Sequence, residues 1–280
     1  MKKGWKIFWI VCAVLAAVGL LLTAAGVVLG GISALRSAQD LEVGITPRWL
    51  ERLENREQDE EAPEPGMKDG VIHDHVDEIS LELGGIQVCV TAGDTDGVQV
   101  DTSALRSDIR EELMVSRDEN ELEIEMRHRG HGMNTNGTGT LYITVPEDRI
   151  LHSFSAWMGA GSLELDGIRT EELSLEVGAG EIIAENFYTE ELDADCGAGQ
   201  VRLQGETVRE AEIDCDLGQI IYTVPGTERD YNYELSCGAG ELLIGGDSFA
   251  GVSKNEKIDH ESERLIKADC GMGLIEIRFQ

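Results

Sequence analysis

A short glycine motif, Gly-x-Gly, recurs along the C-terminal half of the chain between runs in which apolar and polar residues alternate. The second glycine of the motif occurs at six positions, separated by 19, 19, 19, 22 and 33 residues. A near-constant period of about 20 residues is typical of solenoids, in which each repeat buries its apolar side against its neighbours. Asp216 replaces the first glycine in one repeat. The predicted corner glycines are Gly159, Gly161, Gly178, Gly180, Gly197, Gly199, Gly218, Gly238, Gly240, Gly271 and Gly273.

The alternating runs predict two short strands in each repeat, because successive side chains of a strand point to opposite faces. Glycine suits the corner between them, since it tolerates positive φ and lets a neighbouring backbone approach closely. Stacked repeats would pair in parallel about 4.8 Å apart. We therefore predict an all-β fold, a parallel β-solenoid. The residue directly before each corner is predicted to belong to a buried core ladder made of Met158, Val177, Cys196, Cys215, Cys237 and Cys270.

The cysteines of this ladder allow three interpretations. Free cysteine packs as a small hydrophobic residue, and Met158 and Val177 at the same repeat position favour that reading. Adjacent repeats would also bring α-carbons within disulfide range. A metal site is the least favoured, because residues spaced along a line do not converge on one ion. A count of free thiols in the denatured, non-reduced protein separates the first two interpretations.

The N-terminus carries a long apolar run. Residues 7–29 are uncharged, which is long enough to cross a hydrocarbon core of about 30 Å as an α-helix. Lys2, Lys3 and Lys6 precede the run, so the positive-inside rule places the N-terminus in the cytoplasm and the rest outside. We expect a single retained transmembrane helix and a cell-membrane location. A cleaved signal peptide is the alternative, although its apolar region is usually shorter.

The remaining sequence divides into a linker and a β-domain. Residues 1–32 form the predicted cytoplasmic stub and membrane helix, and residues 33–75 a linker that is partly helical. The β-domain is predicted over 76–280, with an entry cap of hairpins at 76–150 and the repeats at 151–280. Residues 245–263 are interpreted as an insertion that accounts for the 33-residue interval and could lie over one face.

The chain is strongly acidic, with a formal net charge of −31. Such a charge disfavours binding to nucleic acid or to an anionic lipid surface. Glu176, Asp195, Asp214 and Asp269 share an outward repeat position and are expected to stack partly into a column. Calcium would relieve their repulsion, but solubility and protection of the sheet edges are the simpler interpretation. The histidines at 73, 75, 128 and 131 are interpreted as incidental surface residues rather than metal ligands.

The apolar N-terminal run, the strand Leu141–Val145 ending at Pro146 and the tandem Gly-x-Gly repeats together resemble a bacterial family. The chain is similar, over roughly 76–280, to the "putative adhesin" domain family of cell envelopes and to the related toast-rack domains of envelope-stress proteins. The resemblance implies a membrane-attached extracytoplasmic β-solenoid without known active-site residues. It is consistent with adhesion or envelope sensing.

No catalytic constellation and no cofactor motif is recognisable, so we expect a protein that is not an enzyme and carries no cofactor or metal. The predicted function is a membrane-anchored, non-catalytic adhesion or envelope-interaction module. Envelope-stress sensing through a membrane partner is the first alternative, and a carbohydrate-binding or carbohydrate-cleaving solenoid is the second. Expected partners are the membrane, through residues 7–29, and another envelope or membrane protein or a surface glycan.

Overall fold

The computed structural model describes residues 70–127, 138–249 and 256–280. The predicted membrane helix and most of the predicted linker lie outside these residues. Within them, no helix has the length and apolar character needed to cross a membrane. The part described belongs to a compact unit at Met67–Gln280.

The described fold is all-β, with only a single α-helical turn and one 3-10 turn among its elements, α4 (Ser107–Glu112) and η2 (Glu228–Asp230). The strands of the N-terminal part are β1 (Val71–His73), β2 (Glu78–Leu83), β3 (Ile86–Gly93), β4 (Val98–Asp101), β5 (Leu113–Asp118), β6 (Glu121–Met126) and β7 (Thr140–Pro146). The central strands are β8 (Leu151–Met158), β9 (Gly161–Asp166), β10 (Arg169–Val177), β11 (Glu181–Cys196), β12 (Gln200–Cys215) and β13 (Gln219–Val224). The last strands are β14 (Asn232–Cys237), β15 (Glu241–Ile244), β16 (Asp247–Ser248), β17 (Glu256–Ile258), β18 (Leu265–Cys270) and β19 (Leu274–Phe279).

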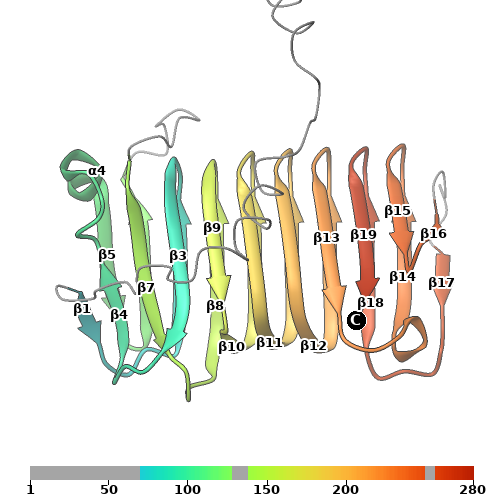
Figure 1. Ribbon diagram of the computed structural model, residues 1–280, viewed down its shortest axis with the longest axis horizontal. Helices are drawn as coiled ribbons and strands as arrows, with labels where there is room; N and C mark the ends of the chain where they lie inside the picture. The colour runs from blue at the N-terminus through green and yellow to red at the C-terminus, as the bar shows by residue number, and fades with distance from the viewer. Residues whose placement is uncertain (1–69, 128–137, 250–255) are drawn as a thin grey trace, which may run out of the picture. The chain divides into compact units, whose positions relative to one another are not determined.

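The chain coils so that its strands form two stacked layers, which we call the pre-corner and post-corner sheets. The pre-corner sheet contains the strands that come before a corner, in the spatial order β6, β2, β8, β10, the second half of β11, the second half of β12, β18 and β14. The post-corner sheet contains, in the same spatial order, β7, β3, β9, the first half of β11, the first half of β12, β13, β19 and β15. All of these pairs are parallel, and Figure 1 shows the coils side by side like the slots of a rack.

Sequence order and spatial order differ at both ends of the stack. The coil β2–β3 lies between β6–β7 and β8–β9, although it precedes both in the chain. The last coil, β18–β19, inserts between β12–β13 and β14–β15. The rungs at each end are therefore not the first or last in sequence.

Short antiparallel strands close the two ends. At one end β5 pairs with β6, while β4 pairs with β7 and β1 with β4. At the other end β16 pairs with β15, and β17 with β14. The expectation that residues 245–263 lie over one face is wrong for their described strands, which extend the two sheets instead. These antiparallel strands cover the outermost parallel rungs. Unpaired edge strands invite aggregation, so the cover protects the two ends of the stack.

Alternation along every strand fills the space between the sheets. In β11 the residues Ile182, Ala184, Leu192 and Ala194 are at most 2% exposed. Because their strand neighbours face outward, a single layer of aliphatic side chains from each sheet forms the core. Leu192 and its equivalents in adjacent coils stack in register, for example on Leu173 and Ala211.

Threonine marks the second bend of the coil, where no glycine motif occurs. Thr170, Thr189 and Thr207 are at most 4% exposed and lie in register across β10, β11 and β12. The hydroxyl of Thr189 donates to the carbonyl oxygens of Glu171 and Glu191 at 3.0 and 2.8 Å. A buried hydroxyl needs such partners, and here it supports the backbone where the ladder between β11 and β12 is irregular.

Candidate interaction surface

The predicted corner glycines lie at the turns between the two sheets. The turns stack on one another through backbone hydrogen bonds, such as those from the amides of Ala179 and Ala198 to the carbonyls of Gly159 and Gly178 at 3.0 and 2.7 Å. These turns form the upper rim of the rack in Figure 1.

Close approach of neighbouring turns, rather than positive φ, is what requires most of these glycines. Among the predicted corners only Gly161 has a positive φ, of 124°. A β-carbon added to Gly178, Gly197 or Gly238 would lie 2.7–2.9 Å from a carbonyl oxygen of the adjacent turn. At the second glycines, such as Gly180 and Gly199, the carbonyl oxygen would be closer still. The weaker constraint at the first position explains why Asp216 is tolerated there while Gly218 is kept.

The residues of the predicted core ladder lie inside the stack, on the pre-corner sheet. Each is at most 2% exposed, and the set comprises Met158, Val177, Cys196, Cys215, Cys237 and Cys270. The cysteines are free thiols in the structure. Their register follows the spatial order of the coils, so that Cys270 lies between Cys215 and Cys237.

The outer side of the pre-corner sheet is covered by carboxylates. One row runs in register from Glu176 through Asp195 and Asp214 to Asp269. Trp157 continues it beyond Glu176, and its indole nitrogen donates to the Glu176 carboxylate at 3.0 Å. We call the outer side of β8, β10, β11, β12 and β18 on this sheet the acidic face.

Two further rows, which the sequence analysis did not single out, widen the acidic face. Asp193 is in register with Glu212, and Glu172, Glu191 and Glu210 form the third row. Counting back two and four residues from the first row would have found them, because strand side chains repeat on one face every second residue. Acidic residues at three consecutive outward positions therefore make the face broadly negative.

Cations neutralise only part of this face. Lys267 contacts the carboxylates of Glu210 and Glu212 at 2.6 and 3.7 Å, and Arg209 contacts Glu191 at 2.7 Å. Within the described parts of the chain no salt bridge involves Asp195 or Asp214. The first row is thus the least compensated part of the acidic face.

Burial and mutual repulsion raise the pKa of carboxylates on the acidic face. Burial and then the charges of Asp195 and Asp269 raise the pKa of Asp214 to about 6. Burial, followed by repulsion from Asp193 and Glu176, raises the pKa of Asp195, and burial with repulsion from Glu212 raises that of Asp193. Both causes disfavour the charged form, so the face carries unfavourable electrostatic energy at neutral pH.

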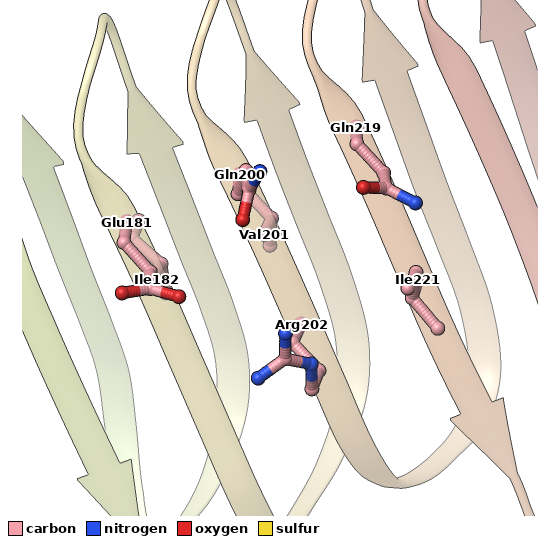
Figure 2. Close-up of a pocket in the computed structure, with 7 residues that line it drawn as sticks. All are labelled: Glu181, Ile182, Gln200, Val201, Arg202, Gln219 and Ile221. Atoms are coloured by element: carbon pink, nitrogen blue, oxygen red, sulfur yellow. The ribbon is translucent and has the colours of Figure 1, made fainter. Parts of the chain in front are cut away.

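The outer side of the post-corner sheet has a different chemistry. Gln200 and Gln219 are in register across β12 and β13, and Ile183, Arg202 and Ile221 form the row beside them. A shallow depression of about 10 Å³ lies here, bounded by Glu181, Ile182, Gln200, Val201, Arg202, Gln219 and Ile221. Figure 2 shows these side chains on the three successive strands β11, β12 and β13. It has room for about one water molecule.

A line of apolar side chains occupies the middle positions of the corners. Leu217 and Met272 are 59% and 65% exposed, and the Met272 amide donates to the carbonyl of the residue before Leu217. Ala179, Ala198 and Ala239 are exposed at the same repeat position in other turns. These middle positions are therefore uncharged, while Asp216 places an exposed carboxylate at the first position of one corner.

No arrangement suited to a metal ion occurs in the residues that the structure describes. Three or more His, Cys, Asp or Glu side chains do not converge there. The carboxylates of the acidic face lie in straight rows about one strand spacing apart, whereas calcium needs six to eight oxygens around one point. His73 lies in β1, while the histidines at 128 and 131 lie outside the described residues.

Comparison with known proteins identifies one family and several similar folds. The sequence matches the family described as Toastrack DUF4097 over residues 76–257. No curated protein matches the chain.

Similar solved structures include a "putative cell adhesion protein" from Clostridium sporogenes, 16% identical, covering 76% of this chain and 98% of that one with a TM-score of 0.49. A "putative adhesin" from Bacteroides fragilis is 16% identical, with coverages of 76% and 98% and a TM-score of 0.44. Another from Parabacteroides distasonis is 12% identical, with coverages of 75% and 95% and a TM-score of 0.41.

Proposed function

This chain belongs to the Toastrack DUF4097 family, and from that premise we propose that its β-domain is a non-catalytic adhesion module that makes contact through a flat outer face. The observation that carries the proposal is the packed interior. Inward-facing residues of both sheets are almost fully buried, so the space between the sheets is filled by side chains. The depression on the post-corner sheet holds no more than about one water molecule. A pocket for a small ligand usually measures several hundred Å³.

The acidic face is the surface that we assign to this contact. Its carboxylates stand on strands fixed by continuous parallel ladders, so their spacing is rigid. Repulsion along the first row already raises the pKa of Asp214. A cationic partner surface would relieve that repulsion, and complementary charge speeds association and selects partners.

We further propose that residues 7–29 hold the domain at a cell membrane with the N-terminus in the cytoplasm. The support is the uncharged run itself and the three lysines that precede it. Extraction of membranes at high pH tests the anchor. A chain released into the soluble fraction, or one whose N-terminus begins after residue 29, would contradict it.

Adhesion can be tested with two matched variants of the full chain. The first, Asp193→Asn/Asp195→Asn/Asp214→Asn, removes three charges from the acidic face. The control, Glu164→Gln/Asp166→Asn/Glu185→Gln, removes three from the post-corner sheet, where these residues lie on β9 and β11. Binding to a polylysine-coated surface is measured at physiological salt.

The first variant should bind about tenfold more weakly, which corresponds to roughly 0.5 kcal/mol for each exposed charge. The control should bind within about twofold of the unmodified chain. Equal losses in both variants would mean that net charge, not the acidic face, governs binding. If the chain binds neutral glycans and neither variant binds them more weakly, carbohydrate recognition would replace charge as the basis of adhesion.

A further inference from the structure

The interior of the stack contains an uninterrupted row of cysteines. In-register pairing joins Cys196 to Cys215, Cys215 to Cys270, and Cys270 to Cys237. The insertion of β18 between β12 and β14 sets the order of the row. In a stack built in sequence order, Cys237 would instead follow Cys215. All four side chains are at most 2% exposed.

Four in-register cysteines divide into two neighbouring pairs. The pairs are Cys196 with Cys215 and Cys270 with Cys237, whose strands are directly paired. The Cys270 thiol also lies 3.5 Å from the carbonyl oxygen of Glu241, to which it donates. Pairing in this way uses every member, whereas a bond between Cys215 and Cys270 would leave the two outer cysteines single.

The thiols of Cys196, Cys215 and Cys270 each lean toward the next coil in the spatial order, and a β-carbon on Gly273, after Cys270, would lie 2.6 Å from the Cys215 sulfur. A β-carbon on Gly218 would lie 2.5 Å from the Cys196 sulfur, and one on Gly240 would lie 2.7 Å from the Cys270 sulfur. Gly218 ends the corner that follows Cys215, and Gly240 ends the corner that follows Cys237. The corner glycines thus leave space for a sulfur between adjacent coils all along the row, between Cys215 and Cys270 as well as within the two pairs.

The backbone spacing suits a covalent bond within each pair. In-register α-carbons of adjacent parallel strands are about 4.8 Å apart, inside the 4.4–6.8 Å range that disulfides span. In the folded stack the neighbouring Cys215 thiol lowers the pKa of Cys196 to about 7, while Cys196 raises the pKa of Cys215. The thiolate is the attacking species in the exchange.

We propose that the row is an oxidation site that forms two coil-to-coil disulfides, Cys196–Cys215 and Cys237–Cys270, by exchange with an external disulfide. A thiolate of the pair attacks one sulfur of the external disulfide, whose S–S bond breaks and releases one thiol. The second cysteine loses its proton and attacks the mixed disulfide, releasing the other external thiol. Each new bond therefore oxidises two cysteines and reduces one external disulfide to two thiols, which carry the two protons.

Burial determines when the exchange occurs. Because the sulfurs are covered in the folded stack, an external disulfide reaches them while the coils assemble or when they open locally. Chain that folds in the presence of oxidised glutathione should gain both bonds. Chain that is already folded in the reduced state should react far more slowly. This inference is independent of the adhesion proposal, since the cysteines face the core and the acidic face points outward.

The test uses the full chain, which has 6 cysteines. A Cys12→Ser/Cys89→Ser background leaves the row as the only source of thiols. After refolding with oxidised glutathione and removal of excess reagent, the denatured protein is titrated for thiols and its disulfide-linked peptides are mapped by mass spectrometry. We expect the thiol count to fall from four to zero, with Cys196 linked to Cys215 and Cys237 linked to Cys270. Four remaining thiols, a Cys215–Cys270 link or stable glutathione adducts would overturn the proposal.

Two double variants check the pairing separately. Cys196→Val/Cys215→Val and Cys237→Val/Cys270→Val use the side chain that this repeat position already has at Val177, so packing is disturbed little. Each should lose its two remaining thiols on oxidation. The oxidised row should raise the melting temperature on the order of 10 °C over the reduced row. No increase together with complete linkage would show that the bonds form but are strained. If only one of the two double variants loses its remaining thiols, the disulfide proposed for the other variant is overturned.

Discussion

Gly178 and Gly180 bound the same corner but tolerate a side chain differently. A β-carbon on Gly178 meets one carbonyl oxygen at 2.7 Å, whereas one on Gly180 meets both the carbonyl and, at 2.9 Å, the amide nitrogen of Gly161. Backbone atoms cannot rotate away as a flexible side chain can. The Gly180 position is therefore the stricter of the two.

We expect Gly180→Ala to lower the free energy of unfolding by roughly 3 kcal/mol and Gly178→Ala by roughly 1 kcal/mol. Gly84→Ala is the control, because a β-carbon there meets nothing within 4 Å, and it should change stability by less than about 1 kcal/mol. Urea unfolding followed by circular dichroism measures all three. If Gly178→Ala and Gly180→Ala lower the free energy of unfolding equally, the two positions are equally constrained and the prediction fails.

Asp214 makes the stability of the folded chain depend on pH. Its pKa is about 6 in the folded chain, above the ordinary value of 3.8, because of burial and then of repulsion by Asp195 and Asp269. The folded state therefore binds the proton more tightly than the unfolded state, so ionisation costs stability as pH rises from about 4 to about 6. The cost is fully present at pH 7.

Asp214→Asn should therefore stabilise the chain at pH 7 by ~1 kcal/mol, a value that discounts the full shift for solvent screening. The gain should vanish below pH 4, where both states are protonated. Asp148→Asn, which removes an exposed carboxylate from the loop after β7, is the control for loss of a charge outside the acidic face. A gain that persists at pH 3.5 would mean that the amide improves packing instead.

At the scale of strands, alternation and glycine spacing predict the units but not their order. The alternation around each corner predicts both strands, and Ile79–Leu83 with Ile86–Val90 is recognisable as a further coil. The family resemblance is confirmed. The all-β class is likewise that of the described structure.

The positions of the terminal coils could not be predicted from the sequence. The intervals of 22 and 33 residues show that something is inserted, but every coil offers similar apolar positions to either neighbour. The coil β18–β19 and the coil β14–β15 have equivalent inward residues, since Ile266 and Ala268 are in register with Tyr233 and Leu235. The order of the cysteine row depends on that choice, because Cys270 rather than Cys237 lies next to Cys215.

The inserted position of β18–β19 makes β14 and β15 dependent on the C-terminus. β14 pairs with β18 and β17, and β15 with β19 and β16, so neither strand is paired with β12 or β13. A chain ending at Gly246 would keep β14 and β15 but lose the coil they pack on. We expect their amides to exchange as fast as in the unfolded chain, while those of β8 to β11 remain protected.

Hydrogen exchange followed by mass spectrometry measures this outcome. A shorter chain ending at Thr227, which lacks β14 and β15 as well, is the matched control. It should show the same protection in β8 to β11 as the longer truncation. Protected amides in β14 or β15 of the longer truncation would mean that these strands can move onto β12 and β13. The observed order would then be a preference rather than a requirement.

At the scale of the whole molecule, charge opposes the stability that packing provides. The chain carries a formal charge of −31, and the acidic face concentrates carboxylates in rows with few cations. Salt screens such repulsion, with a screening length that falls from about 10 Å at 0.1 M to about 3 Å at 1 M. Electrostatic repulsion between neighbouring coils should therefore weaken as salt is added.

The melting temperature should rise by about 5 °C between 20 mM and 500 mM NaCl. The variant Asp193→Asn/Asp195→Asn/Asp214→Asn should show a smaller rise, because fewer charges remain to be screened. The described residues hold no group suited to a metal ion, so 2 mM CaCl₂ at constant ionic strength should add nothing beyond about 1 °C. A larger, saturable effect of calcium that the variant abolishes would show that the carboxylate rows bind calcium specifically. Screening alone would then be an insufficient account of the acidic face.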